Sequence, residues 1–127
     1  MRKYYFVALL LPLVFYSCKT KTHSPGVSAC GVKDPVNNLP WLKQKVDDAK
    51  SAGTAGMMTI KKFEYKGNAY FHYYEAHMSC MYCIILDCSG EQIIPGALFT
   101  EEEYRELAKE SSGSSAAFLW PRSLPRE

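Results

Sequence analysis

The chain has 127 residues, of which 47% are hydrophobic and 22% are charged. This composition is typical of a folded globular protein, and the length allows a single domain. The formal net charge is +2, but two basic residues, Arg2 and Lys3, lie in a segment that we expect to be removed. The remaining chain carries 13 basic and 13 acidic side chains, and this balance argues against nucleic acid or an anionic membrane face as a partner.

Residues 1–17 have the pattern of an export signal. Two basic residues precede an uncharged stretch from Tyr4 to Tyr16, which is shorter than the ~20 residues that span a bilayer. Ser17 is a small residue of the kind that precedes a cleavage site. The stretch from Leu13 to Cys18 resembles the lipobox of bacterial lipoproteins, which implies a lipid on the thiol of Cys18. An ordinary signal peptide cut nearby and an uncut helix are the alternatives.

Residues 18–28 form the predicted lipidated tether, because the stretch from Lys19 to Gly26 is polar and has no periodicity. We therefore expect a lipoprotein of the bacterial cell envelope that contacts a membrane through its N-terminal lipid. Its domain would lie in the periplasm or on the cell surface. By resemblance to enterobacterial sorting, a lysine directly after the anchor cysteine favours the outer membrane. No cofactor is expected.

The domain is predicted to span residues 29–110 and to begin with a helix. Asn38 is a suitable cap, Pro40 suits the first turn, and Gly53 and Gly56 would end the helix. Hydrophobic residues recur there at spacings of three, four and three positions, as on one face of a helix: Leu39, Leu42, Val46 and Ala49.

The pattern then changes to strands. Met57–Tyr65 and Ala69–His77 are rich in aromatic and β-branched residues, and Lys66-Gly67-Asn68 between them suits a hairpin turn. A third strand is predicted at Tyr82–Asp87 and a fourth at Glu91–Ile94, before Pro95 and Gly96.

A second helix is predicted from Thr100, because Glu103 three positions later completes a capping box. Its buried stripe would be Tyr104, Leu107 and Ala108. Residues 111–127 form a predicted flexible link and tail, in which Ala116–Trp120 is apolar enough to dock as an edge strand. The predicted fold class is therefore α+β, with a helix, an antiparallel meander of three or four strands, and a second helix.

Four cysteines remain when Cys18 carries a lipid, and an even number in an oxidising compartment suggests two disulfides. The ends of an extended strand from Cys83 to Cys88 would lie roughly 17 Å apart, beyond the ~7 Å limit on Cα separation in a disulfide. A Cys80–Cys88 bridge would need a sharp reversal of the chain. We therefore favour the pairs Cys30–Cys88 and Cys80–Cys83.

Seven aromatic residues lie between Phe63 and Tyr82, so both faces of the predicted hairpin carry rings. One face would cover helices and the other would be a binding surface, with Tyr70, Tyr73 and Tyr74 as candidate ligand-binding residues. The sequence contains no recognisable catalytic set. The first hypothesis is therefore a non-enzymatic binding module for a protein or glycan ligand.

Two other functions depend on one short segment. His77, Met78, Cys80, Met81 and Cys83 combine imidazole, thioether and thiolate ligands that suit Cu(I) or Zn(II), which suggests a periplasmic metal-handling protein. Only one Cys-x-x-Cys knuckle is present, whereas a structural zinc site usually takes four ligands. The same pair, Cys80 and Cys83, suggests a thiol oxidoreductase, although no βαβ pattern surrounds it.

Two stretches, Ala29–Pro35 and Asn38–Leu42, resemble a set of small uncharacterised bacterial lipoproteins. Those proteins pair a Cys-x-Val-x-x-Pro segment and a Leu-Pro-Trp-Leu helix start with a later hairpin. Tyr65–Gly67 and Leu86–Gly90 are similar to the two turns of that hairpin region. The resemblance covers most of residues 29–110 and implies the location and the fold, but no biochemical activity.

Overall fold

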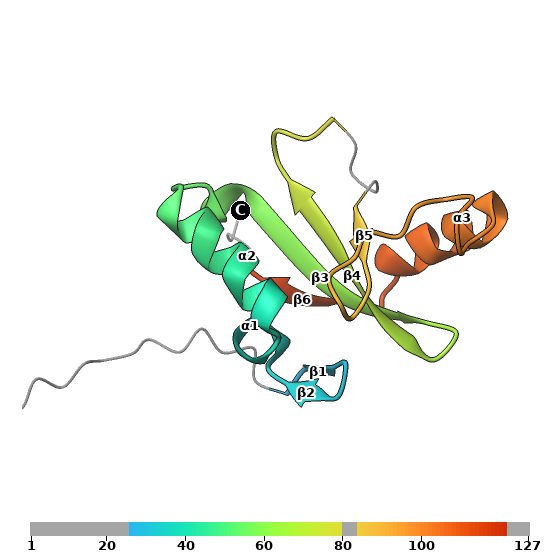
Figure 1. Ribbon diagram of the computed structural model, residues 1–127, viewed down its shortest axis with the longest axis horizontal. Coiled ribbons are helices and arrows are strands. Elements are labelled where there is room, and N and C mark those ends of the chain that lie inside the picture. The colour runs from blue at the N-terminus through green and yellow to red at the C-terminus, as the bar shows by residue number, and fades with distance from the viewer. Residues whose placement is uncertain (1–25, 80–83, 122–127) are drawn as a thin grey trace, which may run out of the picture.

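The computed structural model describes residues 26–79 and 84–121 (Figure 1). Its fold is α+β, as predicted, with a four-stranded antiparallel sheet of strand order β5-β4-β3-β6 and a separate two-stranded hairpin. No helix among the described residues is long and apolar enough to cross a membrane. The elements in chain order are β1 (Ser28–Ala29), β2 (Val32–Lys33), α1 (Pro35–Asn38), α2 (Pro40–Ser51), the 3₁₀ turn η1 (Ala55–Met57), β3 (Met58–Tyr65), β4 (Asn68–Glu75), β5 (Ile85–Leu86), α3 (Glu101–Ser111) and β6 (Ala117–Trp120).

The long β3–β4 hairpin is the centre of the sheet. Its pairing runs without interruption from Met58 opposite Glu75 to Tyr65 opposite Asn68. The turn consists of two residues, Lys66 and Gly67, with φ angles of +50° and +80°. Two-residue hairpin turns of this kind match the twist of the strands that they join. The predicted hairpin is thus confirmed, with Asn68 belonging to the strand and not to the turn.

The sheet has a separate core on each face, because successive strand side chains point to opposite sides. Ile60, Phe71 and Tyr73 pack with α1 and α2, whereas Phe63 and Tyr70 pack with α3. Figure 1 shows α2 and α3 lying over different parts of the sheet. The sheet is therefore covered on both sides, although α3 reaches only the part of its face near the hairpin turn.

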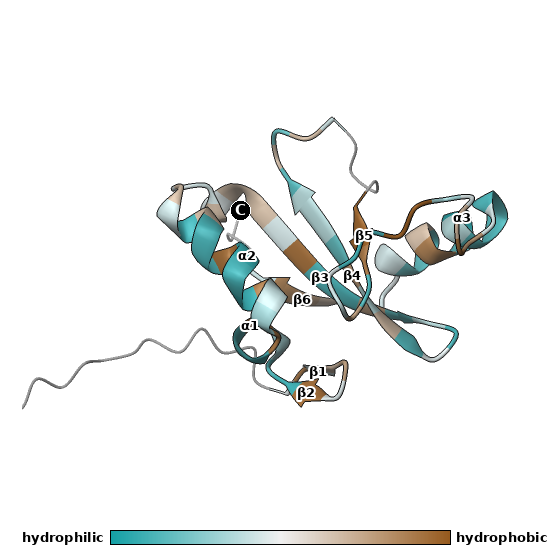
Figure 2. Ribbon diagram, in the orientation of Figure 1, coloured by the Kyte–Doolittle hydropathy of each residue, from teal (hydrophilic) through white to brown (hydrophobic). Residues whose placement is uncertain are grey.

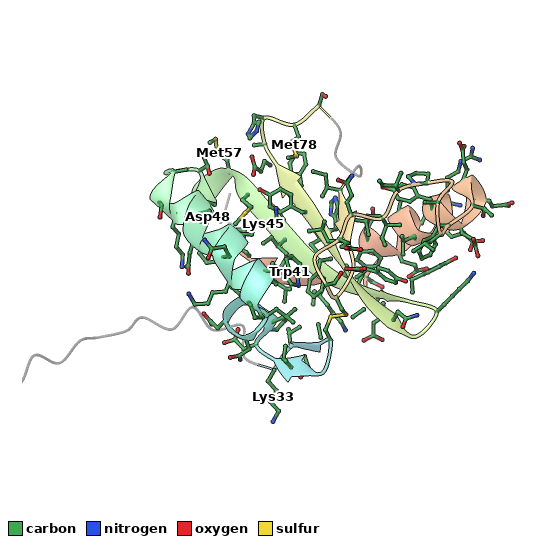
Figure 3. The ribbon with its side chains drawn as sticks, in the orientation of Figure 1. Lys33, Trp41, Lys45, Asp48, Met57 and Met78 are labelled. Atoms are coloured by element: carbon green, nitrogen blue, oxygen red, sulfur yellow. A yellow bond between two sulfur atoms is a disulfide. The ribbon has the colours of Figure 1, made fainter. Side chains whose placement is uncertain are left out.

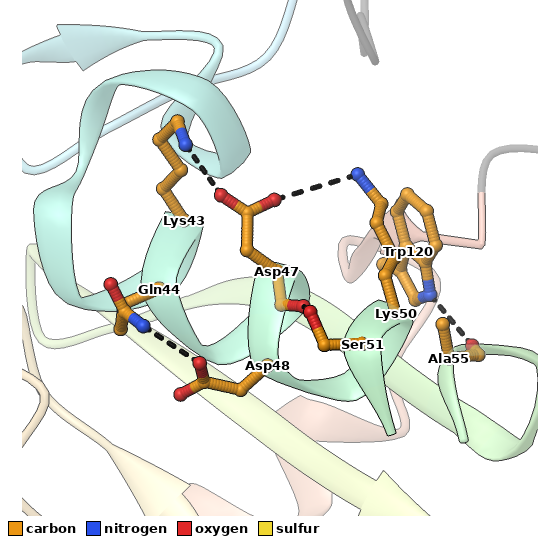
Figure 4. Close-up of polar contacts among 8 residues, drawn as sticks. All are labelled: Lys43, Gln44, Asp47, Asp48, Lys50, Ser51, Ala55 and Trp120. Carbon is orange, nitrogen blue, oxygen red and sulfur yellow. Dashed lines mark hydrogen bonds and ion pairs between the residues drawn. The ribbon is translucent and has the colours of Figure 1, made fainter. Parts of the chain in front are cut away.

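Helix α2 buries Leu42, Val46 and Ala49 and turns its charged side chains outward, as the spacing predicts. On the outer side Lys43 and Lys50 pair with Asp47 (Figure 4). The predicted cap is wrong. The N-cap is Leu39, because Asn38 ends the preceding helical turn α1, and its side-chain amide donates to the carbonyl of Lys33 at 2.6 Å.

The predicted helix end is right. Helix α2 ends at Ser51, and Gly53 follows with a φ of +73°, the left-handed conformation that glycine adopts easily. Gly56 lies beyond it, inside η1, and therefore does not end the helix.

The strands after the hairpin differ most from the prediction. β4 ends at Glu75 and not at His77, and the described part of the third strand is only Ile85–Leu86. Glu91–Ile94 is not a strand: Gln92 makes a single bridge to Leu86. A tight turn precedes it, in which a carboxylate oxygen of Asp87 accepts hydrogen bonds from the backbone N–H groups of Ser89 and Glu91 and from the Ser89 hydroxyl.

Two C-terminal predictions are confirmed. The Thr100 hydroxyl accepts from the backbone N–H of Glu103 at 3.2 Å, and the Glu103 carboxylate accepts from the backbone N–H of Thr100 at 3.0 Å. Strand β6 pairs with β3 and forms an edge of the sheet. The sheet therefore includes residues 117–120 of the predicted tail.

Candidate functional site

A groove of about 520 Å³ lies between α2 and the strand β4. On α2, its lining residues recur every three or four positions, so they share the helix face next to the buried stripe. Trp41, Lys45 and Asp48 lie along that helix in Figure 3. The side chains of the lining that carry a ring, an amide or a charge are Trp41, Gln44, Lys45, Asp48, Tyr73 and Glu75.

Trp41 is a fixed wall of the groove. Its indole N–H donates to the carbonyl of Cys88 at 2.9 Å, and its ring meets Phe71 edge-on with centroids 5.2 Å apart. Gly90 lies against the indole so closely that a Cβ atom there would be 2.7 Å from Cδ2 of Trp41. Contacts from two segments far from α2 in sequence therefore hold the ring in one orientation.

Tyr73 forms the floor of the groove and contacts two of its charged side chains. The ring is buried, and its hydroxyl donates a hydrogen bond to the carboxylate of Glu75. The Lys45 ammonium lies 4.4 Å from the ring centroid, within the range of a cation–π contact. The second oxygen of Glu75 lies 3.1 Å from Nε2 of His77. The Lys45 ammonium from α2 and the Glu75 carboxylate from β4 thus both contact Tyr73.

The rim of the groove on the α2 side is polar and open to water. Asp48 is exposed, and one of its oxygens accepts a hydrogen bond of 2.7 Å from the Gln44 side chain. Among the described residues, the lining contains no cysteine, serine or histidine, so this part of the chain offers no such nucleophile with an adjacent imidazole base. An aromatic wall with a few placed polar groups is typical of a binding site.

The disulfide Cys30–Cys88 is present, with a Cα–Cα distance of 5.6 Å and a sequence separation of 58. It ties the β1–β2 hairpin to the turn after β5, as the sequence analysis favoured. Because the carbonyl of Cys88 accepts the hydrogen bond from Trp41, the disulfide also supports the wall of the groove. The second predicted pair, Cys80–Cys83, lies outside the described residues.

The three candidate tyrosines do not form one surface. Tyr73 lies on the α2 side of the sheet, whereas Tyr70 and Tyr74 point to the other side, as the alternation along a strand requires. Tyr70 is buried, with Phe63 stacked on it at 5.9 Å and Phe99 edge-on at 6.1 Å, and burial raises the pKa of its hydroxyl. Tyr74 is half-buried. Only Tyr73 therefore lines the groove.

Sequence reasoning missed the contribution of α2 to this site. Trp41, Lys45, Asp48 and Ala52 follow one another at spacings of four, three and four, one position before Leu42, Val46 and Ala49 of the buried stripe. This spacing can be recognised from the sequence alone. It places the four residues on the edge of the buried face, where a helix meets the sheet that it covers.

The candidate metal ligands are only partly described. His77 is exposed and pairs with Glu75, and Met78 is half-buried against the α2-side core. Cys80, Met81 and Cys83 lie outside the described residues, as does the lipid-attachment candidate Cys18. Within residues 26–79 and 84–121, no three side chains of histidine, cysteine, aspartate or glutamate are grouped as a metal site would need. The metal and thiol-redox hypotheses stay untested predictions.

No protein-family model matches the chain, and no curated protein or solved structure matches it either.

Proposed function

We propose that this chain is a lipid-anchored envelope protein without enzymatic activity. Its small disulfide-stapled domain binds a protein or glycan ligand in the α2–β4 groove. The observation that carries the proposal is the fixed wall of Trp41 and the buried floor of Tyr73 beside the charged groups Lys45, Asp48 and Glu75.

The support for binding is preorganisation. A site whose rings already have hydrogen-bond partners loses little side-chain entropy when a ligand arrives. Trp41 is held by the Cys88 carbonyl and Tyr73 by the Glu75 carboxylate. The lining combines these two rings with polar and charged side chains, so a ligand with alternating apolar and hydrogen-bonding faces fits it. Peptides and sugars both have this character.

The support for an envelope location is the export-signal pattern together with the disulfide. Cys88 is exposed, so the Cys30–Cys88 bond is open to reductants. Such a bond persists in an oxidising compartment and is rare in the cytosol. Together with the predicted lipid anchor at Cys18, this disulfide supports a domain that is held at a membrane outside the cytoplasm.

A pair of adjacent carboxylates on α2 allows a matched test of the groove. Asp48 lines the groove, whereas Asp47 pairs with Lys43 and Lys50 on the outer side (Figure 4). The purified domain would be screened against arrays of oligosaccharides and of short peptides. Asp48→Ala is expected to weaken binding of any ligand found, and Asp47→Ala is expected to leave it unchanged. Equal effects of the two variants, or no ligand in either array, would contradict the proposal that the groove binds a ligand.

The anchor is tested separately by intact mass spectrometry of the exported chain. The expected result is diacylglycerol and further acyl mass on Cys18 and loss of residues 1–17. An unmodified Cys18 would contradict lipid anchoring and leave the groove proposal standing.

A further inference from the structure

The loop between β5 and α3 exposes large aliphatic side chains. Ile94 is 61% exposed and Leu98 is 89% exposed, and no charged residue occurs from Gln92 to Thr100. Figure 2 shows this part of the chain largely in the hydrophobic colour. We call residues 93–99 the apolar loop. Scattered exposed leucines are ordinary, but a whole uncharged loop with two outward aliphatic side chains indicates a contact surface.

The apolar loop is held in place from inside. Ile93 is buried in the α3-side core, and the ring of Phe99 packs against Tyr65 and Tyr70. Between these two anchors the backbone closes on itself, with the N–H of Gly96 donating to the carbonyl of Phe99 at 2.7 Å. Ile94 and Leu98 therefore point outward from an ordered turn. Closing this turn does not need them, because the hydrogen bond that closes it joins backbone groups.

We propose that the apolar loop inserts into the acyl boundary of a lipid bilayer, with Ile94 and Leu98 as its inserted side chains. This inference rests on the lipid anchor of the proposed function. Only eight positions separate Cys18 from Gly26, and a fully extended stretch of that length spans at most about 29 Å. The domain would thus stay close to the membrane, where the effective concentration of lipid is high.

The chemistry of the loop favours lipid over a protein partner. Binding energy at protein interfaces is concentrated in tryptophan, tyrosine and arginine, and the apolar loop contains none of them. Its exposed side chains offer no hydrogen-bonding group, whereas protein interfaces carry about one hydrogen bond per 100–200 Å². A fluid acyl layer needs neither feature and adapts to a protruding turn.

The charges around the loop select the type of lipid. Glu91, Glu101 and Glu102 are exposed and flank it in the sequence, and Glu91 lines a small cavity together with Ile94 and Leu98. Anionic headgroups would repel these carboxylates. The loop should therefore insert more readily into a zwitterionic surface than into an anionic one, opposite to the preference of basic membrane-binding helices.

The test places a fluorescent reporter at the tip of the loop. Leu98→Trp keeps an apolar side chain at a position that is mostly exposed, so folding should not change. Lys33→Trp is the matched control, because Lys33 is exposed on β2, away from the loop (Figure 3). Both full-length variants and the wild type are mixed with phosphatidylcholine vesicles whose acyl chains carry bromine, which quenches indole emission on contact.

The expected result is that emission from the added indole is quenched in Leu98→Trp, while Lys33→Trp shows no quenching beyond the background of Trp41 and Trp120. Replacing part of the phosphatidylcholine by phosphatidylglycerol should reduce the quenching. Ile94→Asn in the Leu98→Trp chain should weaken insertion about tenfold or more, by the apolar area that it removes.

Quenching that is absent or equal at both positions would overturn the inference. Acylation of Cys18 is measured independently by mass spectrometry, so the proposed lipid anchor and the proposed insertion of the loop can be refuted separately. An acylated chain without quenching at position 98 would support lipid attachment at Cys18 and refute insertion of the apolar loop. Quenching at position 98 in a chain without acyl mass would support insertion of the loop and refute lipid attachment.

Discussion

Replacing Gly90 by alanine probes the contact that fixes the groove wall. Gly90 has a φ of +86°, and its added Cβ would lie 2.7 Å from Cδ2 and 2.8 Å from Cγ of Trp41. Carbon atoms normally pack at about 3.5–4.0 Å. The indole has little room to retreat, because its N–H is bonded to the Cys88 carbonyl and its ring meets Phe71.

The cost of Gly90→Ala has two parts. The left-handed backbone conformation costs an alanine about 1–2 kcal/mol. The overpacking against the indole adds about 1–3 kcal/mol. We therefore expect the free energy of unfolding to fall by roughly 2–5 kcal/mol. It would be measured by urea denaturation followed by circular dichroism, with the disulfide intact.

Gly67→Ala is the matched control. Gly67 has a φ of +80°, and an added Cβ would meet nothing within 4 Å, so this variant carries the backbone cost alone. In a Trp41→Ala background, Gly90→Ala should cost no more than Gly67→Ala, because the overpacking is gone. Equal costs of Gly90→Ala and Gly67→Ala in the wild-type background would refute the contact between Gly90 and Trp41.

Three further stability predictions concern the disulfide and the start of α3. Replacing Cys30 and Cys88 together by serine should lower the free energy of unfolding by about 4 kcal/mol, the chain-entropy value for a closed loop of this length. Thr100→Ala removes the cap of α3 and should cost about 1 kcal/mol in the same assay. The backbone N–H of Thr100 and the Lys66 ammonium hold the pKa of Glu103 below its ordinary value of 4.5. The stability from this carboxylate is therefore present above pH 4.5 and is lost as the pH falls through the lowered pKa. Below pH 4.5 the stability difference between wild type and Glu103→Gln should narrow, and a constant difference would contradict this assignment.

Local chemistry was enough to predict several elements. The capping box needs only a threonine and a glutamate three positions apart, and the hairpin needs only two β-rich runs around a glycine-containing turn. Both signals act over a few residues, so the rest of the chain does not alter them. The periodic stripe of α2 is likewise a property of one helix, and its burial was confirmed.

Elements that depend on contacts between distant segments were harder to predict. Glu91–Ile94 looks like a strand, but Gln92 makes only a single bridge, to Leu86. The groove depends on the hydrogen bond between Trp41 and Cys88, which lies 47 positions later in the chain, and no local sequence pattern predicts such a contact. The disulfide was favoured by eliminating other pairs, although the third strand used in that reasoning is shorter than expected.

The candidate tyrosines show a second limit. Period-two alternation already separates Tyr73 from Tyr70 and Tyr74, so they could not share one face of a flat strand. Which face stays open depends on where α2 and α3 pack, and this is decided by the whole fold. The result is that Tyr70 is covered by Phe99, whereas Tyr73 lies under the open groove.

The most direct test of the central claim is a map of backbone and indole N–H chemical shifts during titration with the strongest array ligand. We expect the shifts to concentrate on Trp41, Lys45 and Tyr73, and the affinity measured by the titration to be weakened in Asp48→Ala but unchanged in Asp47→Ala. Shifts that concentrate on the opposite face, around Tyr74 and Phe118, with both variants binding normally, would contradict the claim that the α2–β4 groove is the ligand site.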